Sequence, residues 1–141
     1  PNARGNLRRT ALHYVTKGKF EFMANMLLEN GANPDAADAR GDTSLHLAAE
    51  VNSLSMTKLL LRSNADASIT NKQLYTPIHN AAAAGNTEVA RLLLDHERAI
   101  KPQHESAELA RRVLRVAELH RQHETWSALS ERLPDPVLGI Q

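Results

Sequence analysis

Apolar residues occur in paired blocks that return every thirty-three positions over the first hundred residues. The first block of each pair follows a threonine, as at residues 10–16, which read TALHYVT. Leu12, Val15 and Thr16 stand at the i, i+3, i+4 spacing of one helix face, and threonine is a favourable N-cap. The pattern predicts a short helix from Thr10 to about Lys17.

The second block of each pair is longer and richer in leucine and methionine. It predicts a helix from about Phe20 to Asn30, ended by Gly31 because glycine readily takes the left-handed conformation found after helices. Asn64 holds the same place one interval later, and asparagine tolerates this conformation next best. Turn-forming residues fill positions 32–42, so we expect a loop there rather than a third helix.

Three copies of the pattern lie in one register without a gap. The threonine blocks occupy residues 10–16, 43–49 and 76–82, and the leucine blocks occupy residues 26–33, 59–66 and 92–99. Such a regular interval indicates an internal repeat. In the third copy Pro77 falls in the first helical turn, where its missing N–H costs nothing.

The three copies resemble ankyrin repeats. The family's pattern of Thr-Pro-Leu-His-x-Ala, a glycine, a leucine run and Gly-Ala-Asp is matched nearly position by position from Thr10 to about Ala99. The resemblance implies two antiparallel helices per repeat, a hairpin-like loop at each junction, and stacking into a slightly curved slab. We expect repeats at about 5–37, 38–70 and 71–100, together forming a domain over residues 1–100.

The chain departs from the family pattern at several positions. Leu74 stands where a loop glycine is expected, and Arg8 stands at the same position one repeat before Gly41. Glu97 replaces the glycine that ends the second helix of a repeat. The pattern therefore decays after Leu94, and we expect no fourth regular repeat.

The character of the sequence changes from Lys101 onward. Residues 105–123 predict one longer helix, and residues 125–132 predict a short return helix that brings Trp126 back against it. Stacked repeats leave an apolar face open at each end, so we expect residues 101–133 to form a helical cap and residues 134–141 a loose tail. The predicted fold is an all-α ankyrin-repeat solenoid with a divergent helical C-terminal cap.

Composition narrows the class of protein. The chain is 42% apolar but only 4% aromatic, so alanine and aliphatic side chains must build its core. A net charge of +1 gives no indication of direct nucleic-acid binding. The lack of cysteine excludes disulfides, thiol nucleophiles and cysteine-based zinc sites, and no apolar run approaches the roughly 18 residues that suggest membrane insertion. Because the chain opens at Pro1 without a signal-like segment, we expect a fragment of a longer protein.

Histidines are the first candidates for chemistry. His13, His46 and His79 recur at one repeat position, which favours structural histidines, each bonded to the loop backbone of its own repeat, over acid, base or metal-ligand roles. His120, His123 and Glu124 could bind a metal ion, but this spacing is common by chance, and a solvent-exposed helix face without a metal is favoured.

The sequence contains no phosphate-binding loop, serine elbow or paired carboxylates. We therefore predict no catalytic residue, no metal and no cofactor.

Two stretches could contact a partner. The first twenty residues contain Arg4, Arg8, Arg9, Lys17 and Lys19 without any acid, which fits either an acidic partner or the polar outer face that a terminal repeat needs.

The second stretch is Leu74-Tyr75 in the loop before the third copy. These two apolar side chains fit either a partner anchor or local packing, with Tyr75 lying over its neighbour loop and Leu74 half covered.

The resemblance implies non-catalytic protein binding through loop tips and the first helix of each pair, which form the concave side. Carried onto this chain, the predicted partner-binding residues are Arg9, Lys17, Arg40, Asp42, Glu50, Lys72, Gln73, Leu74 and Tyr75. The wider set of positions on that side includes Asn6, Leu7, Ala39, Val51, Ala83 and Ala84.

We expect the partner to be a protein, whose identity the sequence does not indicate, rather than a small molecule. One alternative is a targeting or substrate-recruiting domain of a larger enzyme or bacterial effector, whose catalytic part lies outside this chain. Another is a structural spacer without affinity for any partner. We expect an intracellular location, cytoplasmic or nuclear, and a periplasmic or secreted effector stays open.

Overall fold

The computed structural model describes residues 6–100 and 111–116, and these residues form helices joined by loops. The elements are a short 3-10 helix η1 (Asn6–Arg8), then α1 (Ala11–Lys17), α2 (Glu21–Glu29), α3 (Ser44–Glu50), α4 (Leu54–Arg62), α5 (Pro77–Ala84) and α6 (Thr87–Ile100). Residues 111–116 are also helical. The described residues therefore confirm the all-α repeat class that the sequence pattern predicts.

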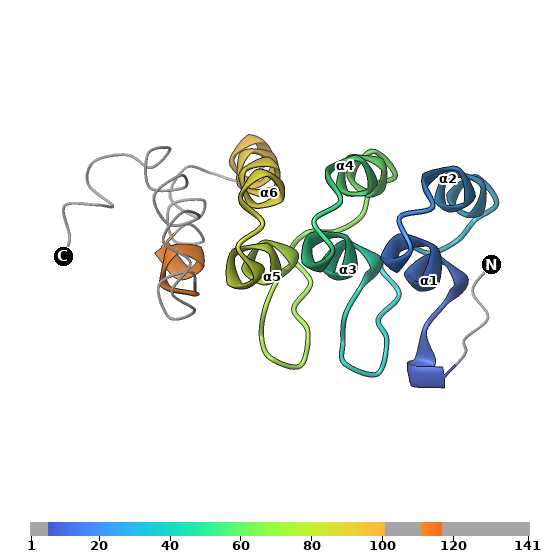
Figure 1. The fold of residues 1–141 in the computed structure, drawn as a ribbon, viewed down its shortest axis with the longest axis horizontal. Coiled ribbons are helices and arrows are strands. Elements are labelled where there is room, and N and C mark those ends of the chain that lie inside the picture. The colour runs from blue at the N-terminus through green and yellow to red at the C-terminus, as the bar shows by residue number, and fades with distance from the viewer. Residues whose placement is uncertain (1–5, 101–110, 117–141) are drawn as a thin grey trace.

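The helices lie in two rows, with α1, α3 and α5 side by side in one and α2, α4 and α6 in the other (Figure 1). Each helix of the first row packs against the following helix of the second row, and long loops project beyond the first row (Figure 1). Two antiparallel helices per repeat and a sideways loop at each junction are thus as expected.

A threonine–histidine pair begins each helix of the first row. In α3 the Thr43 N–H donates to His46 Nδ1 at 3.1 Å, and the His46 N–H donates to Thr43 Oγ1 at 3.4 Å. The same pair opens α1 and α5. Histidine thus takes the place that glutamate or glutamine holds in the usual capping box, which confirms the predicted threonine N-caps.

The second-row helices end as the sequence predicts. Gly31 follows α2 with φ 89°, and Asn64 follows α4 with φ 64°, both in the left-handed region. At the equivalent third position stands Glu97, and the helix runs on to Ile100 without a break. This explains why α6 has 14 residues whereas α4 has 9.

Each projecting loop turns at a residue with positive φ. The angle is 57° at Arg8, 78° at Gly41 and 64° at Leu74, positions that are thirty-three residues apart. A Cβ atom at Gly41 would lie only 2.9 Å from the backbone nitrogen of Lys72, so the neighbouring loop also demands glycine there. Arg8 and Leu74 adopt the left-handed conformation against the steric preference of their side chains.

The core runs the length of the stack and consists mainly of leucine and alanine. Leu60, in the middle of the central leucine run, is fully buried. Val113 and Leu114 belong to the same buried cluster, so the helical residues 111–116 cover the end of the array beside α5 and α6 (Figure 1). The other parts of the predicted cap and the tail lie outside the described residues. No helix of the described part is long and apolar enough to cross a membrane.

Candidate protein-interaction surface

A groove of about 590 Å³ lies between two projecting loops and the ends of α3 and α5. We call it the loop-side groove. It brings together Arg40, Asp42, Glu50, Lys72, Gln73 and Tyr75, six of the nine predicted partner-binding residues. Lys17, Leu74 and Arg9 are not among its lining residues.

Two equivalent side chains give each loop its shape. Oδ1 of Asp38 accepts hydrogen bonds from the backbone N–H groups of Arg40 at 2.8 Å and Asp42 at 3.0 Å. One repeat later, Oδ1 of Asn71 accepts from Gln73 N–H at 2.9 Å and from the backbone N–H of Tyr75 at 3.0 Å. Each loop thus carries a buried acceptor that fixes its tip, so the groove is formed before any partner arrives.

Hydrogen bonds of equal sequence span tie each loop to the next. Nε of Arg9 donates to Oδ2 of Asp38 at 3.2 Å, and Nδ2 of Asn71 donates to Oδ1 of Asp42 at 2.8 Å. Together with the contacts His13–Asp42 and His46–Tyr75, these bonds form what we call the loop ladder. Every rung joins residues that are 29 positions apart.

Arg9 and Asp42 occupy equivalent repeat positions and are both buried in the loop ladder. Burial alone would raise the pKa of Asp38, but the N–H donors of Asp42 and Arg40 and the Arg9 guanidinium outweigh it and hold that pKa below its usual value. Asp38 therefore stays ionised opposite Arg9. Both predicted residues position the loops and present little surface to a partner.

The repeated histidines link adjacent repeats. Nδ1 of His46 accepts from the Thr43 N–H, so the proton sits on Nε2, which donates to the carbonyl oxygen of Tyr75 at 2.8 Å. His13 contacts the carbonyl oxygen of Asp42 in the same way at 2.9 Å. Nδ1 of each histidine accepts from the backbone N–H of the threonine that precedes its own helix, as predicted for a bond within the same repeat. The additional bond of His13 and His46 was not predicted, because it comes from the following loop, which brings its carbonyl oxygen to Nε2.

Burial lowers the pKa of His46, although the Tyr75 carbonyl and nearby carboxylates act in the other direction. Burial and the Arg112 charge lower the pKa of His79 to about 4. These two rings are therefore neutral at neutral pH. Within residues 6–100 and 111–116 no group of three potential ligands could hold a metal ion, and His120, His123 and Glu124 lie outside them.

Leu74 and Tyr75 have different surroundings. Leu74 is 77% exposed at the loop tip. The Tyr75 ring is partly buried and stacks on His79, with ring centroids 5.7 Å apart and an angle of 21° between planes. Tyr75 thus packs on the helix of its own repeat rather than over a neighbouring loop, and only Leu74 projects freely.

The exposed positive and negative side chains of the loop-side groove come from different elements, the loops and the end of a helix. Arg40 and Lys72 lie exposed on successive loops, whereas the exposed Glu50 ends α3. Lys17 is exposed at the end of α1, one repeat before Glu50. Asn80 also lines the groove, although it is not among the predicted residues. Asn80 directly follows the motif histidine, and this position differs in every repeat, with Tyr14 in the first and Leu47 in the second. Variation between repeats at this position is the sequence feature that could have indicated Asn80.

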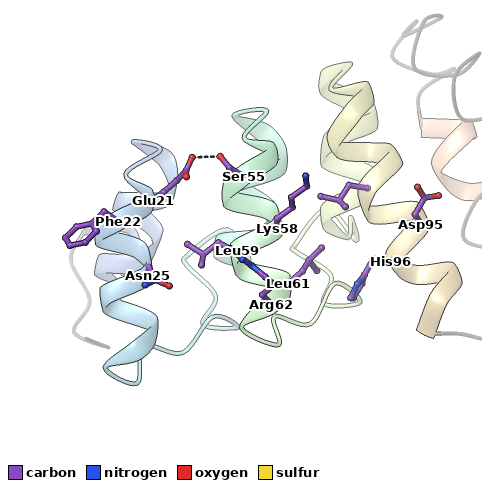
Figure 2. Close-up of a pocket in the computed structure, with 11 residues that line it drawn as sticks. Glu21, Phe22, Asn25, Ser55, Lys58, Leu59, Leu61, Arg62, Asp95 and His96 are labelled. Atoms are coloured by element: carbon purple, nitrogen blue, oxygen red, sulfur yellow. Dashed lines mark hydrogen bonds between the residues drawn. The ribbon is translucent and has the colours of Figure 1, made fainter.

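A second groove, of about 880 Å³, lies across the second-row helices α2, α4 and α6 (Figure 2). We call it the outer groove. Its apolar lining includes Leu59, Leu61 and Leu92, and its charged lining includes Lys58 and Arg62. A hydrogen bond from Ser55 to Glu21 joins α4 to α2 at one end, and the Phe22 ring points away from α4 (Figure 2). None of the predicted partner-binding residues lies in this groove.

Comparisons with known proteins agree with the repeat pattern. The family model described as ankyrin repeats (3 copies) matches residues 1–71 and 45–136. The protein NF-kappa-B inhibitor alpha of Sus scrofa is 42% identical to this chain over 53 residues. That match covers 38% of this chain and 17% of the relative, so it spans a small part of that protein.

Proposed function

The chain belongs to the ankyrin-repeat family, whose repeats generally mediate protein–protein interactions and are typically non-catalytic, and we propose that this chain is a protein-binding module that uses its loop-side groove. The observation that carries the proposal is the preformed groove that gathers six of the nine predicted residues. The relative from Sus scrofa is by name an inhibitor of NF-kappa-B, which supports action on a partner as the kind of function to test.

The groove offers distinct chemistry at its two edges. Arg40 and Lys72 supply cations on the loop edge, and Glu50 supplies an anion at the helix edge. A partner segment with a carboxylate toward the loops and a cation or amide toward α3 would complement both edges. Leu74, at the tip of the same loop as Lys72, adds an exposed apolar contact.

Rigidity of the loops supports this choice of surface. Each tip is fixed by a buried acceptor, and the loop ladder ties the tips to one another. Binding to preformed loops avoids the entropic cost of ordering them, which leaves more of the contact energy for affinity. Of the three leucines that line the outer groove, Leu59 is buried in the core and only 8% exposed, whereas Leu61 and Leu92 are partly exposed.

A charge reversal tests the proposal. Once a partner has been identified by affinity capture and its direct binding measured by calorimetry, Arg40→Glu with Lys72→Glu is compared with Lys58→Glu with Arg62→Glu. Both double variants reverse two exposed cations, the first on the loop-side groove and the second on the outer groove.

We expect the loop-side variant to lose at least about tenfold in affinity, since rim and core charges together determine electrostatic complementarity, and the outer variant to bind normally. Loss of binding only in the outer variant would assign the interface to the outer groove. The alternative of a recruiting domain for a distant catalytic part, and the intracellular location, stay predictions.

A further inference from the structure

The N-terminal end of the stack, at the first repeat, carries an exposed apolar surface. Ala11 and Val15 of α1 and Met23, Met26 and Leu27 of α2 line a depression of about 430 Å³, with Asn30 at its edge. We call these five apolar residues the end face. Met23 is 53% exposed and Met26 is 47% exposed. An exposed apolar surface of this kind on a folded domain usually marks an interaction site.

The repeat register shows what normally covers these positions. Met56 and Val89 stand thirty-three and sixty-six residues after Met23, and both are 0% exposed. Leu60 holds the place of Leu27 in the second repeat and is also fully buried. Since α2 packs on α4 and α4 packs on α6, the second and third repeats each have a preceding helix pair that the first repeat lacks, and this difference accounts for the exposure of Met23. The end face therefore has the chemistry of an internal junction.

The two ends of the array differ in whether their apolar face is covered. At the far end Val113 and Leu114 join the buried cluster and cover the last repeat. At the near end, positions that would be polar on a capping repeat are methionine and leucine. Phe22 provides an internal comparison, since it is 77% exposed while its equivalents Ser55 and Glu88 are exposed as well. Exposure at Phe22 is thus a property of the repeat, whereas exposure at Met23 is peculiar to the end.

We propose that the end face docks one further helix pair of the ankyrin type, stacked in the same direction and register as the described repeats. The side of that pair which meets Met23 and Leu27 would match the side of α1 and α2 that covers Met56 and Leu60. This surface is separate from the loop-side groove, so it adds to the proposed partner binding and does not depend on it.

A chimera tests this proposal. A second copy of residues 38–70 is placed directly before residue 5 of the chain, in place of residues 1–4, which keeps the thirty-three-residue register across the join. Met23→Glu is introduced into both the full chain and the chimera, and Phe22→Glu on the same helix serves as the matched control. Urea unfolding and sedimentation are measured for all six proteins.

We expect the chimera to unfold in a single transition at higher urea than the full chain, because each added repeat contributes a new interface. Met23→Glu should raise the unfolding equilibrium constant of the chimera by at least about tenfold at a fixed urea concentration, but that of the full chain by less than about twofold, since the side chain is half exposed only there. Phe22→Glu should have an equally small effect in both backgrounds.

Three results would overturn the proposal. The added repeat could unfold separately at lower urea, or Met23→Glu could act equally on the full chain and the chimera. The full chain could also sediment as a dimer that Met23→Glu dissociates, which would assign the end face to a second copy instead.

Discussion

Oδ1 of Asp42 accepts a 2.8 Å hydrogen bond from Nδ2 of Asn71, and this bond joins two successive loops beneath the surface. Asp42 cannot be removed without leaving the buried Asn71 amide short of its partner. Because a buried polar group left unsatisfied costs about 1–3 kcal/mol, Asp42→Ala should lower the free energy of unfolding by that amount. Urea denaturation measures the change.

Glu50→Ala is the matched control, since Glu50 is an exposed acid of the same repeat. Its effect should lie within about 0.5 kcal/mol, as for ordinary surface changes. Equal effects of the two substitutions would show that the Asp42–Asn71 bond contributes nothing to stability.

Substitutions at Leu74 and at Tyr75 should change the melting temperature in opposite directions. Leu74 holds φ 64° at the position of Gly41, and a left-handed residue with a side chain costs roughly 1–2 kcal/mol, part of which glycine recovers. Leu74→Gly should therefore raise the melting temperature slightly while weakening partner binding. Tyr75→Ser removes the ring that stacks on His79 and should lower the melting temperature. A Leu74→Gly variant that melts earlier would show that the exposed leucine supports the loop.

Stability should depend on pH through His79. Its pKa falls from about 6.5 in the unfolded chain to about 4 in the folded chain, so the unfolded state binds more protons between these values. The stability linked to this histidine is complete above pH 6.5 and is lost as the pH falls toward 4. Urea midpoints at pH 7, 6, 5 and 4.5 should follow this decline.

His79→Gln isolates that contribution, because glutamine at this helix position completes a standard capping box and does not titrate. The variant should keep its fold and show a smaller decline over the same pH range. An unchanged decline in His79→Gln would assign the pH dependence to other groups, His46 first among them because its pKa is also lowered.

The C-terminal residues should be needed for the third repeat. A chain stopped after Gln103 loses Val113 and Leu114, which share the buried cluster with Leu93 and Leu94. We expect this truncation to lower the urea midpoint and to expose apolar surface that binds a hydrophobic dye. A truncated chain with an unchanged midpoint would show that residues 104–141 form an independent appendage.

Sequence reasoning succeeded where structure is local or periodic. The interval of thirty-three residues, the threonine caps and the left-handed residues Gly31 and Asn64 each follow from a few neighbouring positions, and all are found in the structure. Propensity and capping act within one helix, so a short stretch of sequence contains the needed information.

The site was harder to predict because it depends on how one loop meets the next. Arg9 and Asp42 read as exposed polar residues in a loop, yet the following loop covers them and uses their side chains. The Nε2 partners of His13 and His46 also belong to the following loop, so the sequence of one repeat does not indicate them. The outer groove has no signal in the family motif. An open apolar face is expected at each end of a stack of repeats, but the residues that form it at the first repeat follow from the exposure of equivalent positions in the structure.

The constant span of the loop ladder has a consequence for how the chain folds. Every rung closes over 29 residues, so no rung requires distant ends of the polypeptide to meet. Low contact order of this kind favours rapid folding, and domains can fold progressively during synthesis. A nascent chain that has left the ribosome as far as Asp42 already contains both partners of the first two rungs. The next two become possible once Tyr75 has emerged, so translation itself can set the order in which the loops are locked.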